Sequence, residues 1–273
     1  MNAVLNQSDV RLPRRSLARR MEGHKALTVT IAFVAFMGLW HLYVAFIYDS
    51  PFIKLPTIPN TIQAFIDLIR SGELQLAAGE SYWVLLIGSV PAIIAGTVFG
   101  LLIGSSWRAD TALSPYIFAF FSTPFPALIP VFILIFGLGV SGKAAIVFTL
   151  VVVTMLLQTI AGVKNVDIRY LEAARAFGSP AWRTLIEVQF PAALPFIVAG
   201  IRLAIGRALV GVVIAEFDTA LSGLGALIFK WAGRIQLPKA FVPALIFSIT
   251  GILLAAVLRS IERRLERWKL SET

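Results

Sequence analysis

Long apolar runs, separated by short polar segments, dominate this chain. Six of these runs are long enough to cross about 30 Å of hydrocarbon at 1.5 Å per residue. They occupy residues 27–48, 82–104, 113–139, 144–163, 193–217 and 240–258. The pattern therefore predicts an all-α membrane protein with six transmembrane helices in a single domain, residues 26–260, flanked by polar basic tails at 1–25 and 261–273.

Two of the segments between the runs are also expected to be helical. In the predicted outer loop 49–81, four large apolar residues recur at helical spacing, which predicts an amphipathic helix at the membrane surface: Ile62, Phe65, Ile66 and Ile69. In the outer segment 218–239, a Gly-rich turn leads into an apolar stretch. A second helix at the outer surface fits that composition.

The second run carries small residues at strict four-residue spacing, namely Gly88, Ala92, Gly96, Gly100 and Gly104. Rows of this kind let helix backbones approach closely in lipid, so the row predicts the face on which this helix packs. The fifth run carries a shorter row, Gly200, Ala204 and Ala208.

The third run is rich in proline. Pro115 lies near its predicted start, where a first-turn proline is tolerated, whereas Pro124, Pro126 and Pro130 lie inside it. The "STPFP" stretch that begins at Ser122 should therefore break the helix where the freed carbonyl groups meet protein or water. A structural kink and a lining of the transport pathway are both compatible with this pattern.

The fifth run carries Arg202, Arg207 and, near its end, Glu216. A charge at the centre of a span costs about 2.5–3.5 kcal/mol on insertion scales, so these side chains should face protein or a wet cavity. Arg207 and Glu216 are nine residues apart, on opposite sides of a helix, and cannot pair along one face. Structural pairing and contact with a transported solute both remain open for these residues.

Composition and charge agree with a membrane protein and set its orientation. Hydrophobic residues make up 58% of the chain and charged residues 14%, against about 25% charged in soluble domains. With both tails in the cytoplasm, the inner segments hold 16 of the Lys and Arg residues and the outer loops six. This is the positive-inside bias, and it explains the net charge of +9 without nucleic acid. The absence of Cys excludes disulfides, Cys-metal sites and a Cys nucleophile.

The cytoplasmic loop 164–191 has the punctuation of two short helices. Asp167 is a cap for the first, residues 168–177, and Gly178 suits the position after its end. Ser179 and Pro180 then suit the start of the second, which Pro191 should end. From these residues alone, docking into a partner's groove and folding back on the membrane domain are equally good interpretations.

The spacing within this loop resembles the EAA signature of ABC-importer permeases. "EAARAFG", nine further residues and "VQFP" place Glu172, Ala173, Ala174, Gly178 and Pro191 at the signature positions. The similarity extends over residues 80–260 to "GIRLAIGRALVGVVIAEF" and "SGLGALI", and it is strongest to the branch that imports nitrate, taurine and other sulfonates. It implies a type I importer fold in the bacterial inner membrane and favours docking of the loop.

The same resemblance implies the partners and the activity. The chain would be one half of a homodimeric channel for a small anionic solute, surrounded by membrane lipid. A separate ATPase dimer would hold ATP and Mg²⁺ and dock on the loop, and an extracytoplasmic binding protein would deliver the solute. The chain itself would bind no cofactor and catalyse no reaction. Ser122, Pro124, Pro126, Arg202, Arg207 and Glu216 are candidates for the pathway.

Other classes of protein fit the sequence less well. An ion-coupled secondary transporter is the main alternative, but it would usually carry an intramembrane carboxylate site and internal repeats. A membrane-embedded enzyme would need a catalytic cluster such as HExxH, which the sequence lacks.

Overall fold

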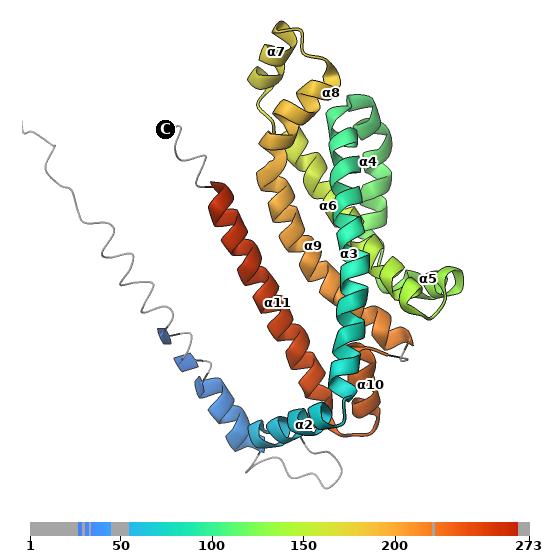
Figure 1. Ribbon diagram of the computed structural model, residues 1–273, viewed down its shortest axis with the longest axis vertical. Coiled ribbons are helices and arrows are strands. Elements are labelled where there is room, and N and C mark those ends of the chain that lie inside the picture. Colours follow the sequence, from blue (N-terminus) through green and yellow to red (C-terminus); the bar gives the residue numbers. More distant parts are fainter. Residues whose placement is uncertain (1–26, 29–30, 33, 45–54, 220–221, 267–273) are drawn as a thin grey trace, which may run out of the picture. The chain divides into compact units, whose positions relative to one another are not determined.

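The computed structural model describes residues 27–28, 31–32, 34–44, 55–219 and 222–266, and the regular structure in them is helical (Figure 1). Two compact units are present, residues 1–58 and 59–273. In the first, the described residues between 27 and 44 are helical, and Trp40 Nε1 donates a hydrogen bond to the Pro56 carbonyl at 3.1 Å. The remainder of the predicted first span, and the tail 1–25, lie outside the described residues.

The second unit is a series of helices joined by short turns. They are α2 Ile58–Arg70, α3 Glu73–Ser105, α4 Trp107–Ser122, η2 Phe125–Leu128, α5 Ile129–Phe136, α6 Val140–Lys164, α7 Ile168–Ala176, α8 Ala181–Thr184, the π-helical turn η3 Leu185–Gln189, α9 Phe190–Thr219, α10 Leu224–Gly233 and α11 Leu237–Glu266. Within the described part of the chain, four helices are long and apolar enough to cross a membrane, or five if the bent α4–α5 pair is one span.

Helix α3 begins nine residues before the predicted second span. Gly72, with φ of 78°, separates it from α2, and the helix then runs from Glu73 without interruption. The outer loop predicted to reach residue 81 is therefore wrong in its last part. Hydropathy did not reveal this first portion of α3 because it carries the polar residues Glu73, Glu80 and Ser81. Glu73 accepts from Lys230 at the surface, whereas Glu80 and Ser81 bond to other residues of the fold.

Both predicted surface helices exist as helices. In α2 the apolar residues that predicted it are exposed, while Ala64 and Leu68 are buried. Half of the residues of helix α10 are buried, and it packs against α9, α11 and α3. Its buried residues are Leu224, Gly225, Ala226, Leu227 and Trp231.

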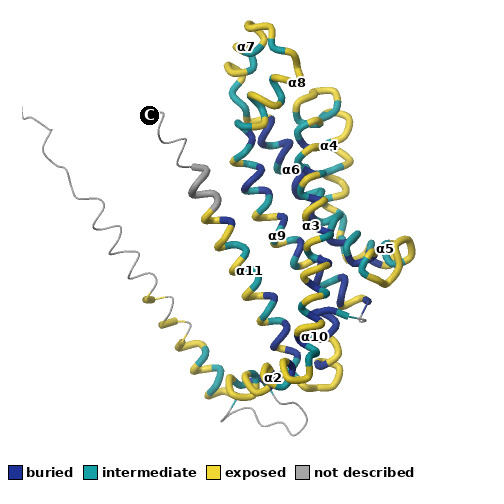
Figure 2. Tube along the Cα trace, viewed as in Figure 1, coloured by how far each residue is buried: buried dark blue, intermediate teal, exposed yellow. Residues whose placement is uncertain are grey.

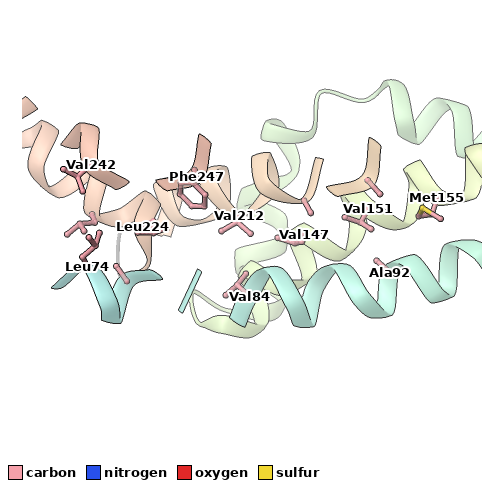
Figure 3. Close-up of a cluster of buried hydrophobic side chains, with 14 of the residues drawn as sticks. Leu74, Val84, Ala92, Val147, Val151, Met155, Val212, Leu224, Val242 and Phe247 are labelled. Atoms are coloured by element: carbon pink, nitrogen blue, oxygen red, sulfur yellow. The ribbon is translucent and has the colours of Figure 1, made fainter. Parts of the chain in front are cut away.

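The core is a layer of three helices in which α6 lies between α3 and α9. The predicted glycine row packs directly on α6. A Cβ at Gly88, Gly100 or Gly104 would press on Val147, Thr159 or Val163 respectively. Figure 3 shows Val147, Val151 and Met155 of α6 beside α3, with Ala92 opposite. On the other side of α6, Gly200 of the second small-residue row approaches the Gln158 side chain. Both packing predictions are confirmed.

Gly96 provides a test of this close approach. In Gly96→Ala the new Cβ would overlap the Met155 side chain and lie 2.9 Å from the Val152 carbonyl oxygen. We expect a loss of about 1–3 kcal/mol in the free energy of unfolding, the usual cost of overpacking. Gly79→Ala in the same helix is the control, because nothing lies within 4 Å of its Cβ. Equal denaturation midpoints for the two purified variants would contradict the close packing.

The predicted break in the third run is confirmed. Helix α4 ends at Ser122, Thr123 is extended, and α4 and α5 meet at 94°. The positions predicted for Pro115 and Pro130 within their helices were wrong. Because Ser106 caps α4 and accepts from the Ala109 amide, α4 begins early and Pro115 lies in its interior. Pro130 lies in the first turn of α5, where its missing N–H has no intrahelical partner to lose.

Candidate functional site

The predicted loop 164–191 folds as expected in its first half. Asp167 caps α7, with its Oδ1 accepting from the Arg169 amide at 2.9 Å. Hydrogen bonds from the Arg169 side chain and backbone lower the pKa of Asp167 to about 2, so the cap stays ionised at neutral pH. Gly178 ends the helix with φ of +70°, and the Ser179 amide donates back to the Ala174 carbonyl at 2.9 Å. This arrangement is the left-handed helix cap that glycine favours.

The second half of the loop differs from the prediction in two ways. Pro180, not Ser179, occupies the cap position of α8, and the Ser179 hydroxyl accepts from Thr184 Oγ1 at 3.2 Å. Pro191 does not end the helix, because α8, η3 and α9 form one continuous helix, Ala181–Thr219. In the π-helical turn η3 the Phe190 amide donates to the Leu185 carbonyl. The wider turn changes the hydrogen-bond register just before Pro191, and the helix continues through the proline.

Most residues of the loop around α7 are exposed (Figure 2). Phe177 is 90% exposed, and Trp182 and Tyr170 are also exposed. Glu172 and Ala173 are exposed and Ala174 is half-buried, so the EAA residues lie at or near the surface of α7. Between the loop and the end of α3 is a groove of about 440 Å³, lined by residues that include Leu102, Leu171, Arg175 and Trp182. The loop thus rests on the membrane domain by one side and leaves its aromatic tip uncovered.

The helix break lies beside a cavity of about 480 Å³ between α4, α6 and α9. Of the predicted pathway residues, Pro126 and Arg207 line it. The Arg207 guanidinium lies 4.3 Å from the centre of the Phe121 ring, a cation–π contact. Ser122 and Pro124 belong to the break but do not line the cavity, and Ser122 Oγ donates to the Phe118 carbonyl. Arg202 is exposed and also lies outside the lining.

Glu216 lies away from this cavity, in a buried polar cluster at the α10 end of the unit. Its side chain is fully buried, with Oε1 accepting from Ser81 Oγ at 2.7 Å and Oε2 from the Gly225 amide at 2.7 Å. Ser81 Oγ also accepts from the Leu224 amide at 2.8 Å. Glu216 therefore fastens the "SGLG" turn, residues 222–225, onto α3 and is a structural anchor in this conformation.

Lys143 extends this cluster and was missed by the sequence analysis. It is 1% exposed, its Nζ donates to the carbonyl and hydroxyl oxygens of Ser222 at 2.8 Å each, and it lies 3.6 Å from a Glu80 carboxylate oxygen. The Ser222 hydroxyl donates to Glu80 in turn. The available signal was Lys143 itself, a lone cation at the start of an apolar run. Its partner Glu80 was hidden because the sequence placed it in a loop.

Apolar helices of membrane length, a capped helical loop at one end and a broken helix beside a cavity define a multi-pass transport permease. The chain belongs to the family described as the binding-protein-dependent transport system inner membrane component, whose model matches residues 92–269. Members of this family are membrane subunits of ABC transporters and not enzymes. The predicted resemblance is thereby confirmed.

Relatives within the family carry different substrate names. A Bacillus subtilis permease named for aliphatic sulfonates is 32% identical over 80% of this chain and 79% of its own length. The taurine transport system permease of Escherichia coli is 27% identical over 79% of this chain and 76% of its own length. The formylaminopyrimidine transport permease of Halalkalibacterium halodurans is 27% identical over 90% of this chain and 97% of its own length.

A solved structure supports the fold. The inward-facing MetNI methionine ABC transporter contains a chain that aligns with a TM-score of 0.57 and 18% identity. The alignment covers 67% of the present chain and 93% of that chain. The protein therefore has the helical fold of an ABC-importer permease.

Proposed function

We propose that this chain is one half of a homodimeric channel that imports a small organic or anionic solute, such as a sulfonate, taurine or nitrate, at the expense of ATP. A cytoplasmic ATPase dimer docks on the loop 164–191 and supplies the ATP and Mg²⁺ chemistry. An extracytoplasmic solute-binding protein delivers the cargo. The chain crosses the membrane six times, residues 26–260 form the permease domain, and the basic tails 1–25 and 261–273 are cytoplasmic.

The structure of the loop is the main support for this proposal. The exposed apolar tip at Phe177 ends a capped helix, and a short turn joins it to the continuous helix Ala181–Thr219, so the loop is suited to transmit a displacement. A rigid connection of this kind can couple closure of the ATPase to rotation of the spans. Glu172, Ala173, Ala174, Gly178 and Pro191 are the proposed coupling residues, with Gly178 setting the turn and the alanines keeping the contact close.

Charge distribution supports the orientation. The end of the unit that holds α7 and α8 also holds the α3–α4 turn (Figure 1). Basic residues gather there, as the positive-inside bias requires of a cytoplasmic face: Arg108, Lys164, Arg169, Arg175 and Arg183. Lys164 forms an ion pair with Asp110 at 2.7 Å, which joins the start of α4 to the end of α6.

The purified chain alone is expected to hydrolyse no ATP, because its sequence has no G-x-x-x-x-G-K-[ST] phosphate-binding loop. Phosphate release would be measured with the chain alone and after addition of its ATPase subunit. Turnover that purifies with the chain alone, in the absence of any other polypeptide, would refute this part of the proposal.

The cargo is tested by isolating the solute-binding protein that co-purifies with the assembled transporter and identifying its bound ligand by mass spectrometry. We expect a small solute that carries a sulfonate group or is itself a small anion such as nitrate. A ligand without any anionic group would overturn the substrate class while leaving the importer mechanism in place.

A further inference from the structure

Arg207 is a half-buried cation in the middle of α9, and no described residue forms an ion pair with it. Lys143, the other cation inside the helical layer discussed above, has its ammonium group surrounded by oxygen atoms of Ser222 and Glu80. The Arg207 guanidinium instead lies over the Phe121 ring. An arginine placed at membrane depth without a counter-ion is costly, and such residues usually mark the path of a solute or ion.

The residues that line the cavity around Arg207 suit a ligand that is mainly apolar. Its lining includes Phe121, Phe125, Leu150, Leu203 and Val210, with Arg207 as the one charged group and Gln158 as the one amide. No carboxylate is among these lining residues. Gly206, beside Arg207, leaves space, since nothing lies within 4 Å of a Cβ placed there.

The position of the cavity also suits a transient site. It opens where α4 breaks at Ser122 and turns through 94° into α5, so one of its walls is a joint between two helices. Another wall is α9, which continues without interruption into the coupling loop. A rotation of α9 relative to the break would change the distance between Arg207 and Phe121.

We propose that this cavity is a subsite for the cargo inside the channel, in which Arg207 binds the sulfonate or carboxylate group and the apolar wall holds the organic part. The guanidinium presents several N–H donors in a planar fork that matches two oxygens of one anionic group. Phe121 holds the guanidinium in place while leaving its N–H edge able to bind. This inference rests on the proposed function.

Direct binding of 1-butanesulfonate to the purified permease–ATPase complex tests the subsite, with butyl methyl sulfone as an uncharged probe of the same shape. We expect Arg207→Gln to weaken butanesulfonate binding roughly tenfold or more, as loss of a charge-assisted hydrogen bond does, and to leave the sulfone unaffected. Arg207→Lys should retain part of the affinity. Arg259→Gln, a charge loss at an exposed position on α11, should bind as the unmodified protein does.

Stimulation of ATP hydrolysis by the binding protein is measured on the same samples. This measurement tests the importer function separately from the Arg207 subsite. One contradicting result is stimulated hydrolysis in every variant together with equal butanesulfonate affinity in the unmodified and Arg207→Gln complexes. Stimulated hydrolysis with no butanesulfonate binding to either complex is another. Both results would overturn the subsite and leave the importer function intact. Absence of stimulation in the unmodified complex would instead contradict the proposed function. An equal loss of affinity for both probes in Arg207→Gln would show that Arg207 only shapes the cavity, which also overturns the subsite.

Discussion

Gly223→Ala is expected to lower the free energy of unfolding more than Gly96→Ala does. Gly223 has φ of +99°, a conformation that L-residues rarely adopt, and a Cβ there would overlap the Glu216 carboxylate, with Oε2 at 2.6 Å. The carboxylate would have to leave its bonds to Ser81 and to the Gly225 amide. Each buried group left unsatisfied costs about 1–3 kcal/mol, so we expect a total loss of at least about 3 kcal/mol.

The measurement is the denaturation midpoint of the purified protein in detergent. Gly233→Ala, at the far end of α10, is the matched control because nothing lies within 4 Å of its Cβ. Midpoints that agree within error would mean that the 222–225 turn is not fastened to Glu216, and the anchor assigned to this residue would be withdrawn.

The second large effect is expected on transport rather than on stability. Gly178→Val should reduce uptake at least tenfold while the protein remains in the membrane. Gly178 ends α7 with φ of +70°, which is a genuine outlier for a β-branched residue. Nothing lies within 4 Å of its Cβ, so the effect must come through the backbone cap and not through packing.

Gly178→Asn separates an effect of the backbone cap from an effect of the added side chain, because asparagine tolerates the left-handed conformation. We expect Gly178→Asn to keep most of the uptake and to co-purify with the ATPase, and Gly178→Val to lose both. Uptake would be measured in cells alongside the amount of permease in the membrane fraction. Full uptake by Gly178→Val would mean that the loop does not need its α7 cap for coupling.

Much of this fold could be predicted because membrane helices are recorded in the sequence by length, hydropathy and small-residue spacing. The row from Gly88 to Gly104 identified the face of α3 that packs on α6, and "STPFP" located the break. The capping residues Asp167 and Gly178 likewise predicted α7. These signals are local, and each depends on residues within one or two helical turns.

Several sequence predictions failed where residues far apart in the sequence satisfy each other's polar groups. Glu80 and Lys143 look like loop residues because each is charged, and their contacts with Ser222 and with each other make them compatible with helix interiors. Pro191 was expected to end a helix, since the π-helical turn that precedes it has no sequence signature of its own. Arg207 and Glu216 carried equal weight as pathway candidates, and only the structure places one in the cavity and the other in the anchor.

The central claim is that the α7 end of the permease docks on a cytoplasmic ATPase. Because the chain has no Cys, single cysteines can be introduced without altering any other position. In the assembled transporter, Phe177→Cys should cross-link to the ATPase subunit, whereas Phe229→Cys, exposed on α10 at the opposite end, should not. Absence of an ATPase adduct from Phe177→Cys, or an equal yield from Phe229→Cys, would contradict the account.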